Sequence, residues 1–196
     1  MKLRIKTLSD ALVSSNDKPI SIYDNDIIYD DIGLPYIPGK RIKGVLKESA
    51  LEIVEMYELS GKQDFLEVFN LLFGSCGYQQ SALAINNLYI EDYEQVKSII
   101  LGKRHENNNL FTKENIIDAC TTVRYQTKID DTGVAEEHSL RNSRVLRKEL
   151  VFEGYIKVEN INSETENLLN LAVSNMRRIG AKRNRGFGKI RATIIK

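Results

Sequence analysis

Apolar and polar residues alternate along three short stretches of the chain. These stretches are KLRIKTL, LVFEGYIKVE and KIRATII, at residues 2–8, 150–159 and 189–195. A period of two is typical of strands that bury one face and leave the other in solvent. The stretch ALAINNLYI, at residues 82–90, also has the composition of a strand. The pattern therefore predicts four strands, two of them at the ends of the chain.

Two longer stretches repeat their apolar residues with the period of an α-helix. The first extends from Gly39 to about Leu59, with Gly61 as its end, and the second follows a capping box formed by Ser163 and Glu166 and stops at Gly180. Shorter helices are predicted at residues 64–73, 93–101 and 113–123, and a short strand at residues 27–30.

The main elements follow the order strand, helix, strand, strand, helix, strand. This order predicts an α+β chain with the βαββαβ ferredoxin-like or RNA-recognition-type fold, carrying insertions. Its antiparallel sheet has helices on one side and one free face. The 196 residues are most simply one domain, residues 1–196. The charged segment 124–149, with a turn at residues 130–133, is predicted to form a projecting hairpin.

The composition of the chain argues against a membrane protein, an exported protein and a histidine-based metal site. No apolar run approaches the roughly 20 residues of a membrane span, and the N-terminus lacks a signal-peptide pattern, so we expect a cytoplasmic protein without a membrane partner. Cys76 and Cys120 lack metal-ligand spacing, and the only histidines are His105 and His138, so a histidine-based metal site is not expected.

The charges are unevenly distributed, although the formal net charge is only +1. After Glu166 the chain has no acidic residue, and acids gather instead at residues 24–31, 91–94 and 136–137. The basic residues of the tail are Arg177, Arg178, Lys182, Arg183, Arg185, Lys189, Arg191 and Lys196. One basic face can bind a polyanion at nearly neutral net charge. The alternative is an ordinary solvated surface.

The stretch GLPYIPGKRIKG, residues 33–44, predicts an anion site. Its Pro38–Gly39 turn leads into a helix whose first N–H groups and dipole favour an anion. Lys40, Arg41 and Lys43 add charge, and Gly44, placed in the first turn, would let a phosphate come close. The glycine spacing of a nucleotide-binding loop is absent, so the expected ligand is a nucleic-acid backbone.

The stretch GAKRNRGFGKI, residues 180–190, predicts a second contact. Glycines allow a close approach of the backbone, and Arg183 and Arg185 can bind phosphates or stack on bases. Phe187 could stack on a base, and a buried hydrophobic anchor is the alternative.

Taken together, LPYIPGKRIKG at 34–44, LFG at 72–74 and GAKRNRGFGKI at 180–190 resemble the RAMP superfamily of CRISPR-associated proteins. The charged segment at 123–154 resembles the projecting thumb of the backbone subunits of type III effector complexes. The resemblance implies a subunit that polymerises along a guide RNA with copies or paralogues of itself, and whose thumb displaces one base pair of the guide–target duplex.

The resemblance also implies functional residues. The predicted RNA contacts are Gly39, Lys40, Arg41, Lys43, Gly44, Arg124, Lys128, Arg141, Arg144, Lys182, Arg183, Arg185, Gly186 and Phe187. Val134 or Leu140 could wedge between bases. Some family members cleave target RNA with an aspartate just before the proline–glycine turn and a divalent metal ion, Mg or Mn. The matching residue here is Asp30, with Asp31 and Asp26 as alternatives.

Other functions stay open at this stage. Within the family, the chain could be a purely structural copy, or a terminal subunit that grips the 5′ handle of the guide. A stand-alone endonuclease that processes CRISPR transcripts usually has two ferredoxin-like domains, and this chain is short for two. A module that docks an acidic protein would bind no RNA.

Overall fold

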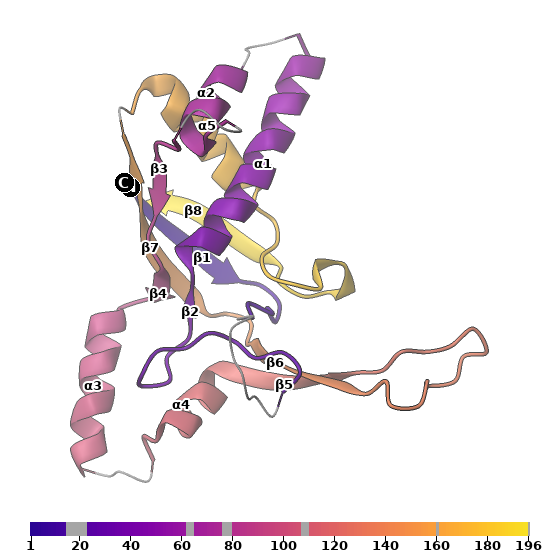
Figure 1. The fold of residues 1–196 in the computed structure, drawn as a ribbon. Helices are drawn as coiled ribbons and strands as arrows, with labels where there is room; N and C mark the ends of the chain where they lie inside the picture. Colours follow the sequence, from indigo (N-terminus) through magenta and orange to yellow (C-terminus); the bar gives the residue numbers. More distant parts are fainter. Residues whose placement is uncertain (15–22, 62–64, 76–79, 107–109, 160, 196) are drawn as a thin grey trace.

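The computed structural model describes residues 1–14, 23–61, 65–75, 80–106, 110–159 and 161–195, and every structural statement below concerns these residues (Figure 1). Cys76 lies outside them. The main sheet has the strand order β2–β4–β7–β1–β8, with β3 also paired to β7, and every pairing is antiparallel. Its strands are β1 (Lys2–Thr7), β2 (Tyr36–Ile37), β3 (Leu83–Ile85), β4 (Leu88–Ile90), β7 (Val151–Val158) and β8 (Ile190–Ile195).

The four strands expected from the sequence lie in the order of a ferredoxin-like sheet, which confirms the predicted fold class. One strand differs from its prediction, because residues 82–90 form the two short strands β3 and β4 instead of one. Asn86 and Asn87 separate them, and Asn86 donates its backbone N–H to the carbonyl of Tyr155. The predicted strand at residues 27–30 contributes only isolated bridges through Ile27 and Tyr29.

One face of the sheet is covered by α1 (Gly39–Leu59), α2 (Leu66–Phe73) and α5 (Ser163–Asn175), which group together in Figure 1. Along β1 the side chains of Leu3 and Ile5 point into this core, while Lys2 and Arg4 lie on the opposite face. Strand β7 repeats the pattern, with Phe152 fully buried. The period of two therefore leaves one sheet face free of the three helices, as expected.

Helix α5 begins where the sequence predicted it but is capped one residue earlier. Asn162, rather than Ser163, is the N-cap: its side chain accepts from the backbone N–H of Thr165 at 2.7 Å, and Thr165 Oγ1 accepts from the N–H of Asn162 at 2.8 Å. The helix ends at Asn175 rather than at Gly180. The chain after Asn175 pairs with the segment before β8 instead, through bonds such as Ile179 N–H to the Gly188 carbonyl at 2.8 Å.

The predicted projecting hairpin consists of β5 (Thr121–Gln126) and β6 (Arg141–Leu146), and it extends away from the sheet in Figure 1. Two helices precede it, α3 (Tyr93–Glu106) and α4 (Lys113–Cys120), so the helix predicted to reach residue 123 stops at Cys120. The turn lies at residues 130–133, where Asp130 Oδ1 accepts the N–H groups of Thr132 and Val134, each at 2.9 Å. The Thr132 hydroxyl, which donates to the same oxygen at 2.7 Å, and secondarily these N–H groups hold the pKa of the Asp130 carboxyl below its usual value.

Among the described residues, no helix has the length and apolar character required to cross a membrane.

Candidate nucleic-acid interface

The start of α1 is fixed by close packing at Gly39. A Cβ on this residue would lie 2.1 Å from the carbonyl oxygen of Ile85, and the Gly39 N–H donates to Asn87 Oδ1 at 3.1 Å. The residue is buried. The close approach that makes glycine necessary here is thus an approach to the chain's own sheet, and one of the N–H groups expected for an anion is already bonded.

The basic side chains at the start of α1 point in two directions, some to the surface and one to the sheet. Lys40 and Arg41 are exposed. Lys43 instead donates its Nζ to Ser81 Oγ at 2.6 Å and to the carbonyl of Leu83 at 2.7 Å, so it ties the helix to β3. Burial, and secondarily the charge of Lys47, lowers the pKa of Lys43. Lys43 therefore has fewer free donors for a phosphate than the sequence suggested.

Gly44 lies on an open stripe of α1. It belongs to the second turn of the helix rather than the first, and no atom lies within 4 Å of the Cβ it lacks. Arg41 and Glu48 are its neighbours on the same stripe, at spacings of three and four residues. Glu48 Oε2 pairs with Arg183 Nη1 at 2.8 Å. Because of this pair, the stripe adjoins the glycine-rich loop at residues 180–190.

Two of the three glycines in the glycine-rich loop, Gly186 and Gly188, have different functions. Gly188 has φ +75°, and a Cβ there would lie 1.9 Å from the carbonyl oxygen of Ile179, so this glycine is required by the fold. Gly186, with φ +84°, follows the short 3₁₀ helix η1 (Arg183–Arg185) and faces open space. Phe187, between them, is half-buried. The loop thus keeps Gly186 and Arg185 on the surface.

The loop contacts the base of the hairpin through Lys182. Its Nζ donates to Gln126 Oε1 at 2.7 Å. The pKa of Lys182 is lowered by burial first, then by the positive charges of Arg185 and Arg141, while Asp24 acts in the opposite direction. Cations from two distant segments thus lie close enough to repel one another, an arrangement that suits a polyanion.

A cavity of about 450 Å³ lies between the hairpin base and the glycine-rich loop. Arg124, Lys148 and Arg185 contribute positive charge to its lining, and Tyr125 and Phe187 contribute aromatic rings. One acidic residue, Asp10, also lines it and pairs with Arg124. Aromatic rings beside cations suit a nucleotide, because the rings can stack on a base while the cations hold its phosphate.

The remaining basic residues of the hairpin have different surroundings. Arg141 is exposed at the start of β6. The guanidinium of Arg144 lies 4.4 Å from the ring centre of Tyr23, and Lys128 pairs with Glu136 at 2.9 Å. The far end of the hairpin, residues 128–139, is acidic overall. The acids there are Asp130, Asp131, Glu136 and Glu137. The surface that suits phosphates therefore lies at the hairpin base rather than at its tip.

Asp30, the aspartate predicted from the sequence to be catalytic, holds the loop before β2 in shape. Its Oδ1 accepts the N–H groups of Ile32, Gly33 and Leu34 at 2.9–3.0 Å, and its Oδ2 accepts the hydroxyl of Tyr93 at 2.7 Å. Both oxygens are thus engaged by the protein itself. This arrangement accounts for an aspartate at this position without any reaction.

The other acids of the loop differ in exposure. Asp26 is buried, with Oδ1 accepting the N–H of Ile27 at 2.8 Å, and Asp31 is exposed. Asp24, which the sequence pattern does not single out, is exposed and accepts the N–H of Asn142 in β6 at 2.7 Å. It also interacts electrostatically with Lys182. Asp24 is therefore the acid of this loop that adjoins both the hairpin base and the glycine-rich loop.

Nothing along the sequence distinguishes Asp24 from its neighbours. Asp24 lies beside the hairpin base only because residues 24–25 pair with strand β6, 118 residues further along the chain. Among the described residues, no group of three or more His, Cys, Asp or Glu side chains is arranged to hold a metal ion. A preformed metal site is thus not built by these residues, and the expected Mg or Mn ion stays a prediction.

Comparison with known proteins identifies the family of the chain and structures with a similar fold. Residues 4–191 match the family model of the RAMP superfamily, and no curated protein matches the chain. A chain in the cryo-EM structure of the type III-B Cmr-beta bound to cognate target RNA aligns with a TM-score of 0.72 at 12% identity, covering 98% of this chain and 95% of that one. A chain of Cmr-beta in the apo state gives 0.67 at 13% identity, covering 100% and 96%. At such identities the likeness establishes the shared fold.

Proposed function

The chain belongs to the RAMP superfamily, and from this premise we propose that it is a guide-RNA-binding backbone subunit of a type III CRISPR effector complex. Its partners would be the guide RNA, the target RNA and further subunits, including copies or paralogues of itself. The similar Cmr-beta structure, which is bound to cognate target RNA, supports this assignment.

One observation carries the proposal: cations from segments far apart in the sequence meet on a single surface. Arg141 from the hairpin and Lys182 and Arg185 from the glycine-rich loop are close enough to affect one pKa, and Arg183 adjoins the stripe of α1 that carries Arg41. Cations arranged in this way bind the phosphate backbone rather than the edges of the bases. A backbone subunit needs this property, because it must accept a guide of any sequence.

Within this surface we assign the RNA contacts unequally. The group that reaches the surface consists of Lys40, Arg41, Gly44, Arg124, Arg141, Lys182, Arg183, Arg185, Gly186 and Phe187. Gly39 and Lys43 serve mainly to attach α1 to the sheet, since each is bonded to β3 or to residues beside it in the sequence. Lys128 and Arg144 act mainly within the hairpin and its base.

RNA binding is tested with RNAs of unrelated sequence and increasing length, titrated against the full chain over a range of salt concentrations. We expect affinity that depends on length and salt but not on sequence. Arg183→Gln with Arg185→Gln should lower the slope of log K against log salt by about 0.7 for each phosphate that is no longer neutralised on a single strand. Lys103→Gln with Lys157→Gln, two exposed lysines on α3 and β7, is the matched control and should leave the slope unchanged. A sequence-dependent loss, or no binding at low salt, would overturn the proposal.

We further propose that target cleavage, where this subunit performs it, depends on Asp24. A carboxylate at this place could accept the proton of a ribose 2′-hydroxyl while the 2′ oxygen attacks the adjacent phosphorus. The bond from phosphorus to the 5′ oxygen then breaks, and the leaving 5′ oxygen takes a proton from water. The products are a 2′,3′-cyclic phosphate and a 5′-hydroxyl. Asp24 adjoins the basic surface, whereas both oxygens of Asp30 accept bonds from the protein.

The test compares Asp24→Asn with Asp30→Asn in the assembled complex. Asp24→Asn should abolish cleavage while the free energy of unfolding and the guide affinity stay near wild type. Asp30→Asn should lower the free energy of unfolding. Undiminished cleavage by a correctly assembled Asp24→Asn complex would exclude Asp24.

A further inference from the structure

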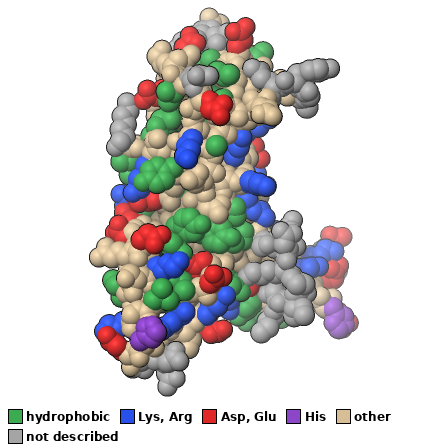
Figure 2. All heavy atoms as spheres, turned by 60° about the vertical axis from the view of Figure 1, so that its left-hand side comes forward, with side chains coloured by type: hydrophobic (Ala, Val, Ile, Leu, Met, Phe, Trp, Pro, Cys, Tyr) green, Lys and Arg blue, Asp and Glu red, His purple; other side chains and the backbone are tan. Residues whose placement is uncertain are grey.

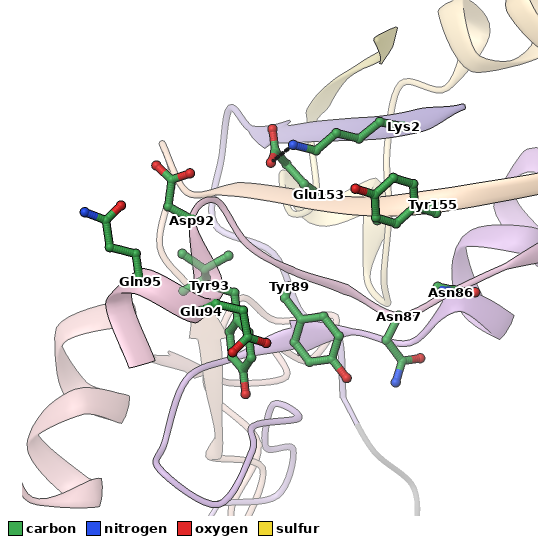
Figure 3. Close-up of a pocket in the computed structure, with 12 residues that line it drawn as sticks. Lys2, Asn86, Asn87, Tyr89, Asp92, Tyr93, Glu94, Gln95, Glu153 and Tyr155 are labelled. Carbon is green, nitrogen blue, oxygen red and sulfur yellow. Dashed lines mark ion pairs between the residues drawn. The ribbon is translucent and has the colours of Figure 1, made fainter. Parts of the chain in front are cut away.

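A second cavity, of about 550 Å³, lies on the sheet face that α1, α2 and α5 leave free (Figure 3). Its walls come from β4, β7 and the beginning of α3, with Lys2 of β1 at its edge. None of the predicted RNA contacts lines it. Figure 2, which brings this side of the molecule forward, shows hydrophobic side chains near the centre of the face with charged side chains around them.

Tyrosine rings in fixed positions form one part of the cavity. The rings of Tyr89 and Tyr93 line the cavity with centroids 4.6 Å apart, and Tyr89 also packs against Tyr36, outside the lining, at 5.6 Å. The Tyr93 hydroxyl is anchored by its bond to Asp30, and burial together with this bond raises the pKa of Tyr93. Tyr155 on β7 is 57% exposed. The cavity thus offers ring surface that is already ordered before any ligand arrives.

The charged residues of the lining are mostly acidic. The lining has three carboxylates, those of Glu153, Asp92 and Glu94, and one ammonium group, that of Lys2, which pairs with Glu153 at 2.5 Å. Glu153 also lies 3.9 Å from Arg4 Nε, so its charge is already balanced by two cations. In the described part of the chain, neither Asp92 nor Glu94 takes part in an ion pair. An RNA phosphate would be repelled here, whereas a cation would find carboxylates beside aromatic rings. Lys97 already lies over the ring of Tyr93, 5.4 Å from its centroid, so the ring surface open to a further cation is mainly that of Tyr155.

We propose that this cavity is a docking site for an arginine side chain presented by a partner protein. The planar guanidinium can lie flat on a tyrosine ring while its N–H groups donate to Asp92 or Glu94, a combination that lysine provides less well. At the opposite end, the side chain of Asn86 can accept from or donate to the backbone of the docked segment. The amide NH2 of Asn87 can donate to it, since Asn87 Oδ1 already accepts the Gly39 N–H. The site lies apart from the basic surface, so it does not depend on the RNA-binding proposal.

The test uses blocked amino acids as probes of the full ¹⁵N-labelled chain. N-acetylarginine amide should produce saturable NMR shifts centred on Asn87, Tyr89 and Tyr155, with a dissociation constant of about 1 mM. N-acetylcitrulline amide, which has nearly the same shape without the charge, should bind at least about tenfold more weakly.

The lining is tested with the double variant Asp92→Asn and Glu94→Gln, which should raise the arginine dissociation constant about tenfold. Asn is well tolerated at residue 92, because the backbone there has φ 56°. The control variant Glu55→Gln with Glu58→Gln removes two exposed charges from α1 and should change nothing.

Three results would overturn the inference: equal binding of arginine and citrulline, absence of saturable shifts at these residues, or saturation of the same residues by hexauridylate. The RNA affinity of the Asp92/Glu94 variant is measured in parallel and should be unchanged. A failure of arginine binding can then be told apart from a failure of the RNA-binding proposal.

Discussion

Replacing Gly44 with alanine should change stability and RNA affinity in opposite directions. Gly44 lies in the interior of α1, and the Cβ it lacks would meet no atom within 4 Å. Alanine in an exposed helix interior is favoured over glycine by about 1 kcal/mol. For a chain of this size that gain corresponds to a rise in Tm of about 2–4 °C.

The same methyl group stands where we expect the RNA backbone to come closest. It would hold the sugar–phosphate chain away from the stripe of α1 and lengthen the contacts of Arg41 and Arg183. We expect the RNA dissociation constant to rise about tenfold, equivalent to about 1.4 kcal/mol. Thermal unfolding and RNA titration of the same preparation measure the two effects.

Gly39→Ala is the matched comparison, since it makes the same chemical change in the same helix but against the protein's own backbone. Its Cβ would lie 2.1 Å from the carbonyl oxygen of Ile85, so we expect a loss of about 3 kcal/mol in the free energy of unfolding. If Gly44→Ala is stabilised and still binds RNA with wild-type affinity, the reasoning about close approach at Gly44 is refuted. If Gly44→Ala is destabilised, the account of α1 itself is wrong.

Four further substitutions test other parts of the structure. Asp30→Ala removes the acceptor of three backbone N–H groups and one hydroxyl, so urea denaturation should show a loss of about 2–3 kcal/mol; a loss below about 0.5 kcal/mol would contradict its capping role. Asn162→Ala removes the N-cap of α5 and should lower the free energy of unfolding by about 1 kcal/mol. An unchanged midpoint of urea denaturation would contradict the capping box. Lys43→Met should lower the free energy of unfolding but leave the salt dependence of RNA binding unchanged. Arg41→Gln should lower the slope of log K against log salt by about 0.7. Equal slopes for the two variants would show that Lys43 and Arg41 do not differ in their contact with RNA.

The sequence predicted most of the sheet and helix α1 well because both depend on local periodicity. Strands β1, β7 and β8 and helix α1 lie where alternation and the helical period placed them. Errors occurred where tertiary contacts override local preference. Residues 176–180 continue the apolar pattern of α5 but pair with the segment before β8, so the helix stops early.

The candidate site was predicted less completely, because the charge and glycine content of a sequence do not show where a side chain points or what a glycine faces. Lys40, Arg41 and Lys43 look equivalent in the sequence, yet only Lys43 turns back to β3. Gly39 and Gly44 also look alike, and only packing separates a glycine required by the fold from one on an open surface. The sequence shows that acids gather in the loop at residues 24–31, but it does not show which of them reaches β6.

Asp30 also links the two surfaces proposed here. Its Oδ1 shapes the loop before β2, and its Oδ2 positions Tyr93, whose ring borders the acidic cavity. Loss of cleavage in an Asp30 variant would therefore not identify a catalytic residue, because displacement of the loop would also disturb the neighbouring acids. Tyr93→Phe removes only the bond to Oδ2 and keeps the three backbone bonds. Arginine binding should weaken in this variant while RNA cleavage stays near wild type, which separates the role of Asp30 in the cavity from its role in the loop.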